Sequence, residues 1–333
     1  MRSRIKALVV LITLGLLLAN MVLAQPLELT ITTDELIYNA TDIIIVDGNL
    51  TYGGLPVSDG IVALEVDDPK SEALLVRSLL TGSADPNQTW PVEILEFYPC
   101  DSSGNPKYDF NPGGTTNFKI RIRNNAGNPN NVLVILSLVY SNKAPFAVFV
   151  MFNSTLSGGQ TMTVTKAPAI TLPDDALAGN TTVYANVYNQ LPKYNGLAYC
   201  PERPSWFLIG ANGQGETSTA EDGHFTLEIS LDGLLVWLGN YTIYANVMYS
   251  WEFQFITTGF EVILVADLNG DGRVDMRDVA IVARAFGSEP GDPLWNPIAD
   301  VTGPIHMVPD GRVDMRDVAF VARAFGVETR TDS

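Results

Sequence analysis

Short runs of β-branched and aromatic residues alternate with turns rich in Gly, Pro, Asn and Asp between Leu27 and Leu264, and helical periodicity is almost absent there. Such a pattern is typical of antiparallel β-sandwiches. The predicted strands fall into three groups: four at 27–33, 43–52, 62–66 and 74–81, seven at 92–98, 117–123, 132–140, 145–152, 160–166, 181–188 and 205–209, and three at 224–230, 241–249 and 255–264.

The first and third groups together supply enough strands for one immunoglobulin-like sandwich, and the second group supplies another complete set. An internal echo supports joining the outer groups, because Gly-Asn-Thr-Thr-Val-Tyr-Ala-Asn-Val at 179–187 closely matches Gly-Asn-Tyr-Thr-Ile-Tyr-Ala-Asn-Val at 239–247. We therefore expect a mainly β fold class with two immunoglobulin-like antiparallel β-sandwiches, one of which (84–210) is inserted in the other (26–83 and 211–264). A plain succession of domains is the alternative.

Two diffuse patterns in these segments resemble known domains. The Gly48-Asn49 turn and residues 56–66 resemble immunoglobulin-like domains of archaeal and bacterial surface proteins. Residues 113–125 and the strand pairs after them are similar to CARDB-like, adhesion-related domains. The resemblance implies architecture rather than activity, because one fold serves many functions.

The C-terminal part contains the sequence Asp-Gly-Arg-Val-Asp-Met-Arg-Asp-Val-Ala twice, at 271–280 and at 310–319. The first copy extends backwards into a twelve-residue calcium loop, in which every second side chain turns inward to the ion. Gly272 stands at position 6, where such a loop turns sharply. Positions 1, 3, 5, 7, 9 and 12 are Asp267, Asn269, Asp271, Arg273, Asp275 and Asp278, of which Arg273 contributes only its carbonyl.

The second copy has no such loop in strict register, since His306 and Val308 would occupy positions 1 and 3. An alignment that treats residues 304–309 as an insertion restores the pattern. We therefore expect two Ca2+ sites, the second with the ligands Asp300, Thr302, Asp310, Arg312, Asp314 and Asp317.

An amphipathic helix is expected after each loop, with Gly287 and Gly326 as the stops. The predicted apolar faces are Val279, Val282, Ala283 and Phe286 in the first copy and Val318, Val321, Ala322 and Phe325 in the second. Only Val265 and Ala266 separate the first loop from the last predicted strand. One such helix buries its apolar face only by packing against the other, so we expect the two helices to pack together. Because a flexible tether needs more residues, we expect the pair to dock against the sandwich.

At 267–326 the chain resembles a dockerin domain, which is built from two such loop–helix units, and residues 327–333 form a tail. The resemblance implies calcium-dependent folding and a cohesin-like or other surface protein as partner. It also implies a docking face that comprises Met276, Arg277, Ala283, Arg284, Met315, Arg316, Ala322 and Arg323. The arginines of this face could instead be solvated or paired with nearby acids.

The N-terminus begins with Arg2, Arg4 and Lys6, followed by an apolar run from Ala7 to Leu18 and by small residues up to Ala24. This pattern predicts a secretory signal peptide at 1–24, with a retained membrane anchor as the alternative. A formal net charge of −17 argues against nucleic acid and anionic membranes as partners. We expect a secreted, extracellular or cell-surface protein with no membrane contact beyond the signal segment.

Export makes two covalent modifications possible. Cys100 and Cys200, the two cysteines of the chain, are expected to form one disulfide in an oxidising compartment. Six sequons could carry glycans, at Asn39, Asn49, Asn87, Asn153, Asn180 and Asn240.

The sequence contains no recognisable catalytic arrangement, and we expect a protein that is not an enzyme. His224 and His306 are the only histidines, and no serine stands in a nucleophile-elbow context. The predicted function is protein attachment through the calcium module, with the sandwiches as adhesive or spacer units. One alternative is a carbohydrate-binding accessory of a polysaccharide-degrading complex; another is a structural surface component whose module only caps the sandwich. The first would use a sugar platform chosen from Trp90, Trp206, Trp237 and Trp251.

Overall fold

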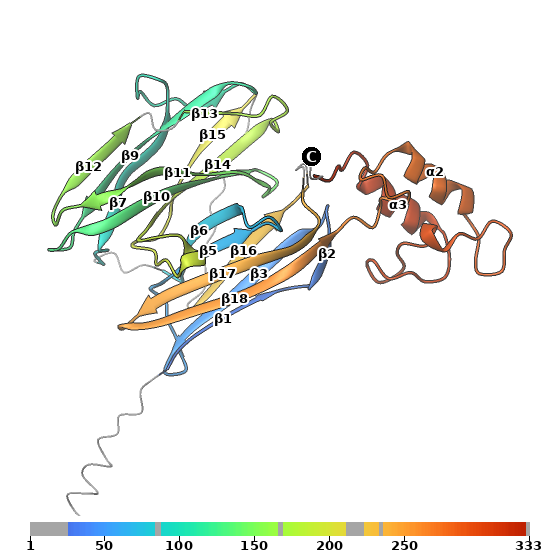
Figure 1. Cartoon of the computed structure of the whole chain (residues 1–333), viewed down its shortest axis with the longest axis horizontal. Helices are drawn as coiled ribbons and strands as arrows, with labels where there is room; N and C mark the ends of the chain where they lie inside the picture. Colours follow the sequence, from blue (N-terminus) through green and yellow to red (C-terminus); the bar gives the residue numbers. More distant parts are fainter. Residues whose placement is uncertain (1–25, 84–87, 166–168, 211–222, 233–235, 331–333) are drawn as a thin grey trace, which may run out of the picture.

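The computed structural model describes residues 26–83, 88–165, 169–210, 223–232 and 236–330. Figure 1 shows two β-sandwiches side by side and a small helical module at one end of the sandwich that contains β1, β3, β17 and β18. The strands are β1 (Leu27–Thr33), β2 (Ile37–Asn39), β3 (Ile43–Tyr52), β4 (Leu55–Pro56), β5 (Gly60–Asp67), β6 (Ala73–Thr81), β7 (Val92–Cys100), β8 (Asp109–Phe110), β9 (Thr115–Asn124), β10 (Asn130–Tyr140), β11 (Pro145–Leu156), β12 (Thr161–Thr165), β13 (Ile170–Thr171), β14 (Gly179–Tyr188), β15 (Arg203–Ile209), β16 (His224–Ser230), β17 (Gly239–Tyr249) and β18 (Glu252–Ile263). The helices are η1 (Pro192–Tyr194), α2 (Met276–Ala285), η2 (Pro297–Ala299) and α3 (Met315–Arg323).

The outer sandwich combines strands from both ends of the β region. One sheet has the order β1-β3-β16 with β4 paired to β3, and the facing sheet has the order β2-β18-β17-β5-β6. Strands β16, β17 and β18 follow the insert in the chain, yet β16 pairs with β3 and β17 pairs with β5. The mainly β fold class, with one antiparallel sandwich inserted in the other and a small helical C-terminal module, is confirmed.

The inserted sandwich consists of the sheet β11-β10-β14-β15-β8 and of a second sheet in which β9 pairs with β7, β12 and β13. Its core contains Phe118, Phe207 and Ile120, all fully buried. The sequence analysis did not predict β2, β4, β8 or β13, because segments of two or three residues are too short to show a periodicity.

The Gly48-Asn49 pair, interpreted above as a turn, lies inside β3 instead. Gly48 is needed there for packing, because a Cβ at this position would lie 2.0 Å from the ring of Phe225. The ring fills that space and contributes to the core of the outer sandwich.

The two sandwiches share an interface in which whole strands are buried on both faces. Every residue of β5 is buried, and so are nine consecutive residues of β10 from Val132 to Tyr140. The Ser137 hydroxyl of β10 donates to the Val76 carbonyl of β6 at 2.7 Å and accepts from the Val76 amide at 3.1 Å. Burial on both faces explains why β10 has a nearly continuous apolar sequence rather than an alternating one.

The echoed sequence contributes one asparagine to each side of this interface. Asn186 of β14 donates to the Val76 carbonyl of the outer sandwich at 3.1 Å. Asn246 of β17 donates in the other direction, to the carbonyls of Pro192 at 2.7 Å and Gly196 at 3.0 Å in the insert. Each sandwich thus uses its copy of the repeat to bond to the backbone of the other.

Charged side chains at the interface are paired across it. Arg77 of β6 donates from Nε to Glu202 Oε2 at 2.6 Å, and its guanidinium stacks on the Tyr184 ring at 3.5 Å. Glu65 of β5 is fully buried, accepts from the Lys193 amide at 2.9 Å and lies 3.4 Å from the Lys193 ammonium. Burial raises the pKa of Glu65 to about 7, although the hydrogen bond and charge of Lys193 oppose the shift.

The predicted disulfide between Cys100 and Cys200 is wrong, because both thiols are free and buried. The Cys200 sulfur lies within hydrogen-bonding distance of the Ile94 backbone, near the start of β7, whereas Cys100 ends that strand. Six residues of strand correspond to about 20 Å, far beyond the Cα separation of about 7 Å that a disulfide tolerates. Burial raises the pKa of the Cys200 thiol to about 12, so it remains protonated and unreactive.

One predicted glycan position is also wrong. Asn39 is 1% exposed and its side chain donates to the Thr41 hydroxyl at 2.8 Å, so no glycan can be attached in the folded chain. Asn49, Asn153 and Asn240 are exposed and Asn180 is half-buried, while Asn87 lies outside the described residues. The predicted signal peptide at 1–24 also lies outside them, and no described helix is long and apolar enough to cross a membrane.

We predict that Glu65→Gln flattens the pH dependence of stability. A carboxyl whose folded pKa is raised stabilises the folded state below its unfolded pKa, near 4.5, and loses this contribution as the pH rises to about 7. The variant should therefore gain up to about 3 kcal/mol relative to the parent chain between pH 4.5 and pH 8. Urea unfolding at both pH values measures this difference, and the exposed Glu28→Gln is the control. Equal pH dependence in Glu65→Gln and the parent would contradict the assignment.

Candidate functional site

Each helix of the C-terminal module starts with the same capping arrangement. In α2 the Asp275 carboxylate accepts from the Arg277 amide at 2.6 Å, while the Asp278 carboxylate reaches back to the Asp275 amide at 2.8 Å. In α3, Asp314 and Asp317 make the equivalent bonds at 2.7 Å and 2.8 Å. These reciprocal bonds satisfy amides that a helix N-terminus otherwise leaves without an acceptor.

The first loop wraps around the carboxylates of its first and last acidic residues. Asp267 accepts from the amides of Gly270, Asp271 and Gly272, at 2.8, 3.1 and 2.8 Å. Asp278 is fully buried and accepts from the amides of Leu268 and Asn269 at 2.9 and 3.2 Å. Gly272 has a φ of +83°, which places the left-handed turn at the position predicted for it.

The second loop repeats this geometry with Asp300 in the place of Asp267. Asp300 accepts from the amides of Asp310 at 3.2 Å and Gly311 at 2.8 Å, and Asp317 accepts from Val301 and Thr302 at 2.9 and 3.0 Å. The alignment with an insertion at 304–309 therefore describes the backbone correctly. The ends of the insertion meet, because a Cβ on Gly303 would lie 2.7 Å from the Asp310 Cβ.

The two loop–helix units are joined by a reciprocal pair of backbone contacts. Val274 of the first loop accepts from the Gly326 amide at 2.9 Å and donates to the Val327 carbonyl at 3.0 Å. Val313 of the second loop accepts from Gly287 at 2.8 Å and donates to Ser288 at 3.1 Å. Each loop is thus closed by the residues that follow the other unit's helix, which gives the module an approximate twofold symmetry.

The buried face of each helix differs from the predicted apolar face. Val282 and Ala285 are buried in α2 and Val321 in α3, whereas Ala283, Phe286, Ala322 and Phe325 are exposed. Ala285 and Ala324 are buried in the shared apolar core. Because α2 ends at Ala285 and α3 ends at Arg323, Phe286 and Phe325 lie beyond the helices, where the helical periodicity no longer holds. Phe286 and Phe325 instead remain 48% and 52% exposed.

All eight residues predicted for the docking face are exposed. Met276 and Met315 are 65% and 63% exposed. Arg277 and Arg316 pair with loop aspartates, because Nη1 of each lies 3.0 Å from Oδ2 of Asp271 or Asp310. Phe286 and Phe325, which the sequence analysis placed on the buried apolar faces, are exposed as well. The signal that could have separated them from the buried residues is their identical position two residues after Arg284 and Arg323.

The loops contain hard oxygen donors, but their carboxylates do not converge. Within the described ranges no three His, Cys, Asp or Glu side chains are grouped closely enough to hold a metal ion. The loop carboxylates instead accept hydrogen bonds from backbone amides and from Arg277 and Arg316. The chemistry of the donor set fits Ca2+, which prefers carboxylate, amide and carbonyl oxygen.

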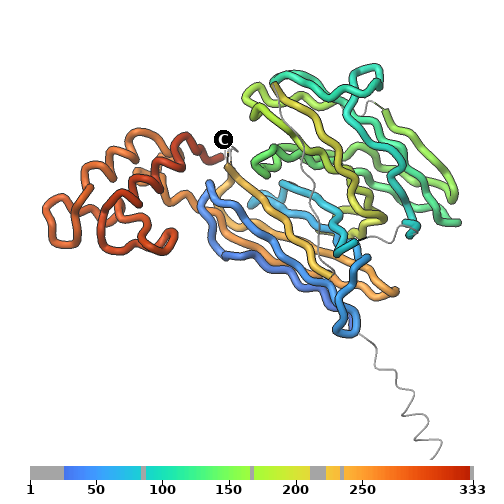
Figure 2. The backbone as a smooth tube through the Cα atoms, turned by 180° about the vertical axis from the view of Figure 1, so that it is seen from behind, coloured from blue at the N-terminus to red at the C-terminus, as the bar shows by residue number. Residues whose placement is uncertain are grey.

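The module packs directly onto the outer sandwich, as its short connection predicted. Ala266, Val274 and Val282 belong to the same apolar core as the outer sandwich. His306 of the insertion lies 3.1 Å from Asp42 Oδ2, and the Val265 amide donates to Asn39 Oδ1 at 3.3 Å. Figure 2 shows the end of the described chain returning from the module to the sandwiches, where the Arg330 amide donates to the Val236 carbonyl at 2.8 Å.

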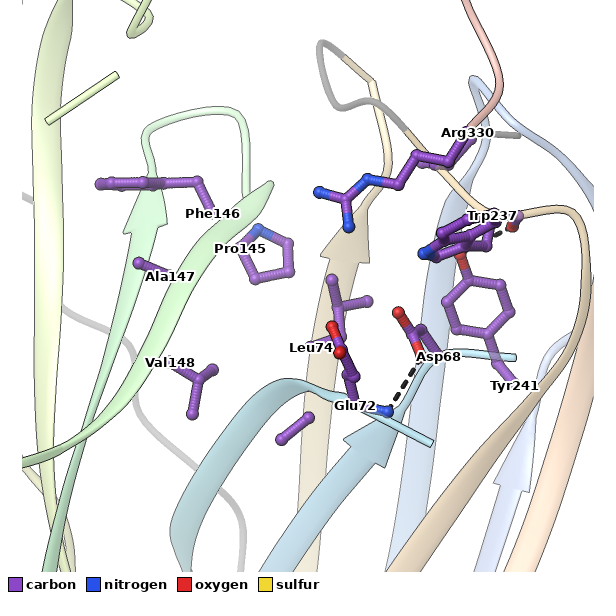
Figure 3. Close-up of a pocket in the computed structure, with 12 residues that line it drawn as sticks. Asp68, Glu72, Leu74, Pro145, Phe146, Ala147, Val148, Trp237, Tyr241 and Arg330 are labelled. Carbon is purple, nitrogen blue, oxygen red and sulfur yellow. Dashed lines mark hydrogen bonds between the residues drawn. The ribbon is translucent and has the colours of Figure 1, made fainter. Parts of the chain in front are cut away.

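That return creates a cleft of about 290 Å³ where both sandwiches and the tail meet. Pro145 and Phe146 of β11 stand on one side and Trp237 and Arg330 on the other (Figure 3). Asp68 Oδ1 in its floor accepts from the Glu72 amide at 3.0 Å.

The four tryptophans considered for a sugar platform belong to different parts of the fold. Trp90 and Trp237 are half-buried, Trp206 of β15 is 44% exposed and Trp251 between β17 and β18 is 89% exposed. The two exposed indoles lie on different sandwiches. Trp206 has the exposed Tyr108 beside it, with ring centroids 5.5 Å apart.

The comparison with family models identifies the module. Residues 265–326 match the dockerin type I domain, which agrees with the resemblance found in the repeat. The match covers both loops and both helices. The comparison with curated proteins finds no match.

Similar solved structures cover parts of the chain. They include the C-terminal domain of wzt (9% identity over 40% of this chain and 81% of that chain, TM-score 0.31) and the sporulation control protein Spo0M of Bacillus subtilis (12%, 51% and 90%, TM-score 0.28). An alkylpurine DNA glycosylase of Pseudomonas fluorescens bound to DNA with an abasic site analog is also similar (15%, 37% and 32%, TM-score 0.28). The chain spans about a third of the length of that glycosylase. At these TM-scores the similarities carry no argument about function.

We predict that Asp278→Ala opens the first loop–helix unit even without calcium. The change leaves the amides of Leu268, Asn269 and Asp275 without an acceptor, which costs about 2 to 3 kcal/mol. Trypsin cleavage after Arg284, followed by mass spectrometry in chelator, should become at least about tenfold faster. Asp317→Ala should do the same for Arg323.

Glu289→Ala, an exposed change in the same module, is the matched control. If Asp278→Ala and Glu289→Ala were cleaved at equal rates, the buried carboxylate would not be what closes the loop onto the helix.

Proposed function

We propose that this chain is a non-catalytic exported protein that attaches to a cohesin-like or other surface protein through its dockerin-type module. The observation that carries this proposal is the exposed, duplicated face of a module that matches the dockerin type I domain. Met276, Phe286 and their counterparts Met315 and Phe325 remain exposed although the module packs against the sandwich. Contact with the sandwich is therefore compatible with binding a partner.

Calcium is the cofactor that the loops would hold. In the first loop the donors would be Asp267, Asn269, Asp271, Asp275, Asp278 and the Arg273 carbonyl, and in the second Asp300, Thr302, Asp310, Asp314, Asp317 and the Arg312 carbonyl. Bound calcium supplies the positive charge that lets carboxylates lie close together. The shared bonding pattern of Asp267 and Asp300 supports two ions rather than one.

The protein residues transmit the state of each loop to its helix. Asp278 bonds both to the loop amides and to the N-cap amide of α2, so a change in loop shape moves the start of the helix. Met276 and Arg277 occupy the first turn of that helix. Ordering the loop therefore orders these two docking residues, and Asp317 does the same for Met315 and Arg316.

The approximate twofold symmetry of the face supports two binding orientations. A partner that contacts Met276, Arg284 and Phe286 could contact Met315, Arg323 and Phe325 after a half-turn. Methionine, arginine and aromatic residues are enriched at protein interfaces. The sandwiches would act as an adhesive or spacer unit, because the module packs onto the outer sandwich, which in turn shares a buried interface with the insert.

We predict that calorimetric titration of the intact chain gives two calcium ions. Asp267→Ala and Asp300→Ala should each bind one ion, since each removes the residue around which one loop closes. Asp59→Ala, which changes an acid outside the module, should still bind two. One ion in the parent chain would remove Asp300 and Thr302 from the ligand set.

We predict that the chain captures a protein from the exported fraction of its own cells in calcium but not in chelator. Because the two faces are equivalent, Met276→Glu or Met315→Glu alone should weaken capture less than about threefold, and the double variant should weaken it at least about thirtyfold. Quantitative pull-down measures the effect, with Met162→Glu in β12 as a control outside the module. Capture that persists in chelator would contradict the proposal.

A further inference from the structure

The end of the outer sandwich opposite the module carries solvent-exposed apolar side chains. Leu55, Trp251 and Phe253 are 70%, 89% and 48% exposed. β18 runs from Glu252 at this end to Ile263 beside the module. At about 3.3 Å per residue its twelve residues span about 40 Å, so the apolar end and the docking face are far apart.

These side chains lie on two tight turns that are neighbours. Gly53 and Gly54 connect β3 to β4, and Ser250 and Trp251 connect β17 to β18. The rings of Tyr52 and Tyr249, which flank the turns, are 5.6 Å apart. The turns therefore form one surface.

Trp251 has an unusual backbone for its size. Its φ is +68° and that of Ser250 is +51°, as in hairpin turns that normally contain Asn and Gly. A left-handed backbone is unfavourable for a residue with a Cβ, and nothing is gained by packing because the indole is almost fully exposed. Strain of this kind at an exposed position points to a role outside the fold.

The chain enters the sandwich between the two turns. The Gly53 amide donates to the Pro26 carbonyl at 3.1 Å, and the Leu27 amide donates to Glu252 Oε2 at 2.9 Å. Upstream of this point no charged residue occurs between Lys6 and Glu28. An uncharged run of about 20 residues is long enough to cross the hydrocarbon of a bilayer. The sequence alone left a cleaved signal and a retained anchor open, but the apolar surface lies where a retained segment would meet the fold.

We propose that this end of the outer sandwich rests on a lipid bilayer, with the segment before Pro26 retained as the anchor. Trp251 then lies among the headgroups, where an aromatic side chain with one polar edge is favoured, and the apolar Leu55 and Phe253 lie beside it. The nearby Glu28 and Glu252 and the net charge of −17 favour zwitterionic over anionic lipid. In this orientation the docking face points away from the membrane. The inference does not depend on calcium or on the identity of the partner.

The test uses the full chain reconstituted into vesicles of phosphatidylcholine that contain brominated acyl chains, which quench nearby tryptophans. Part of the tryptophan fluorescence of the parent should be quenched, and Trp251→Phe should lose that part. Trp206→Phe, which removes an indole from the inserted sandwich, should retain it. Adding Leu55→Trp to the Trp251→Phe variant should restore quenching, since position 55 belongs to the same exposed surface.

Trp251→Gly provides the stability control, because glycine suits a positive φ. It should unfold at no lower temperature than the parent, which would show that the indole does not serve the fold. The proposal is overturned if the parent is not quenched, or if Trp251→Phe and Trp206→Phe retain equal quenching. It is also overturned if the chain isolated from its producing cells begins at Gln25.

Discussion

The C-terminal module depends on two buried carboxylates that each hold a loop and a helix together. Asp278 and Asp317 are fully buried, and each accepts from two amides of its loop and from the N-cap amide of its helix. A buried carboxylate is costly unless such bonds compensate it, so the loop cannot change shape without disturbing the helix. In the proposed function, this coupling is what lets the loops order the exposed residues of the helices.

The β region gives this module a fixed position. The strands β5 and β10 are buried on both faces, and Asn186 and Asn246 bond across the interface in opposite directions. The apolar core of the outer sandwich then continues into the module through Ala266 and Val274. Sandwiches, interface and module therefore form a continuous packed body, in which one end carries the exposed Met276 and Met315 and the opposite end carries Trp251.

The sequence predicted what depends on local pattern. Strands β1, β3 and β16 begin and end at the predicted residues, because alternating apolar residues and flanking turns define them. The insertion in the second loop was also readable, since Asp300 and Gly311 keep the chemistry of Asp267 and Gly272 on either side of it.

Several details that depend on tertiary contact were not predicted. Phe286 and Phe325 continue the helical periodicity along the sequence but face solvent, because α2 ends at Ala285 and α3 ends at Arg323. Cys100 and Cys200 were predicted to pair because the sequence does not reveal the distance between two residues in the folded chain. Asn39 matched a glycan signal, yet its side chain is needed inside the junction between the sandwich and the module.

The most direct test of the account is hydrogen exchange of the intact chain with and without calcium. If the loops hold calcium and transmit its binding through Asp278 and Asp317, calcium should slow exchange in α2 and α3 together and leave β5 and β10 unchanged. Equal exchange of both helices in calcium and in chelator would contradict the central claim that the metal orders the docking face.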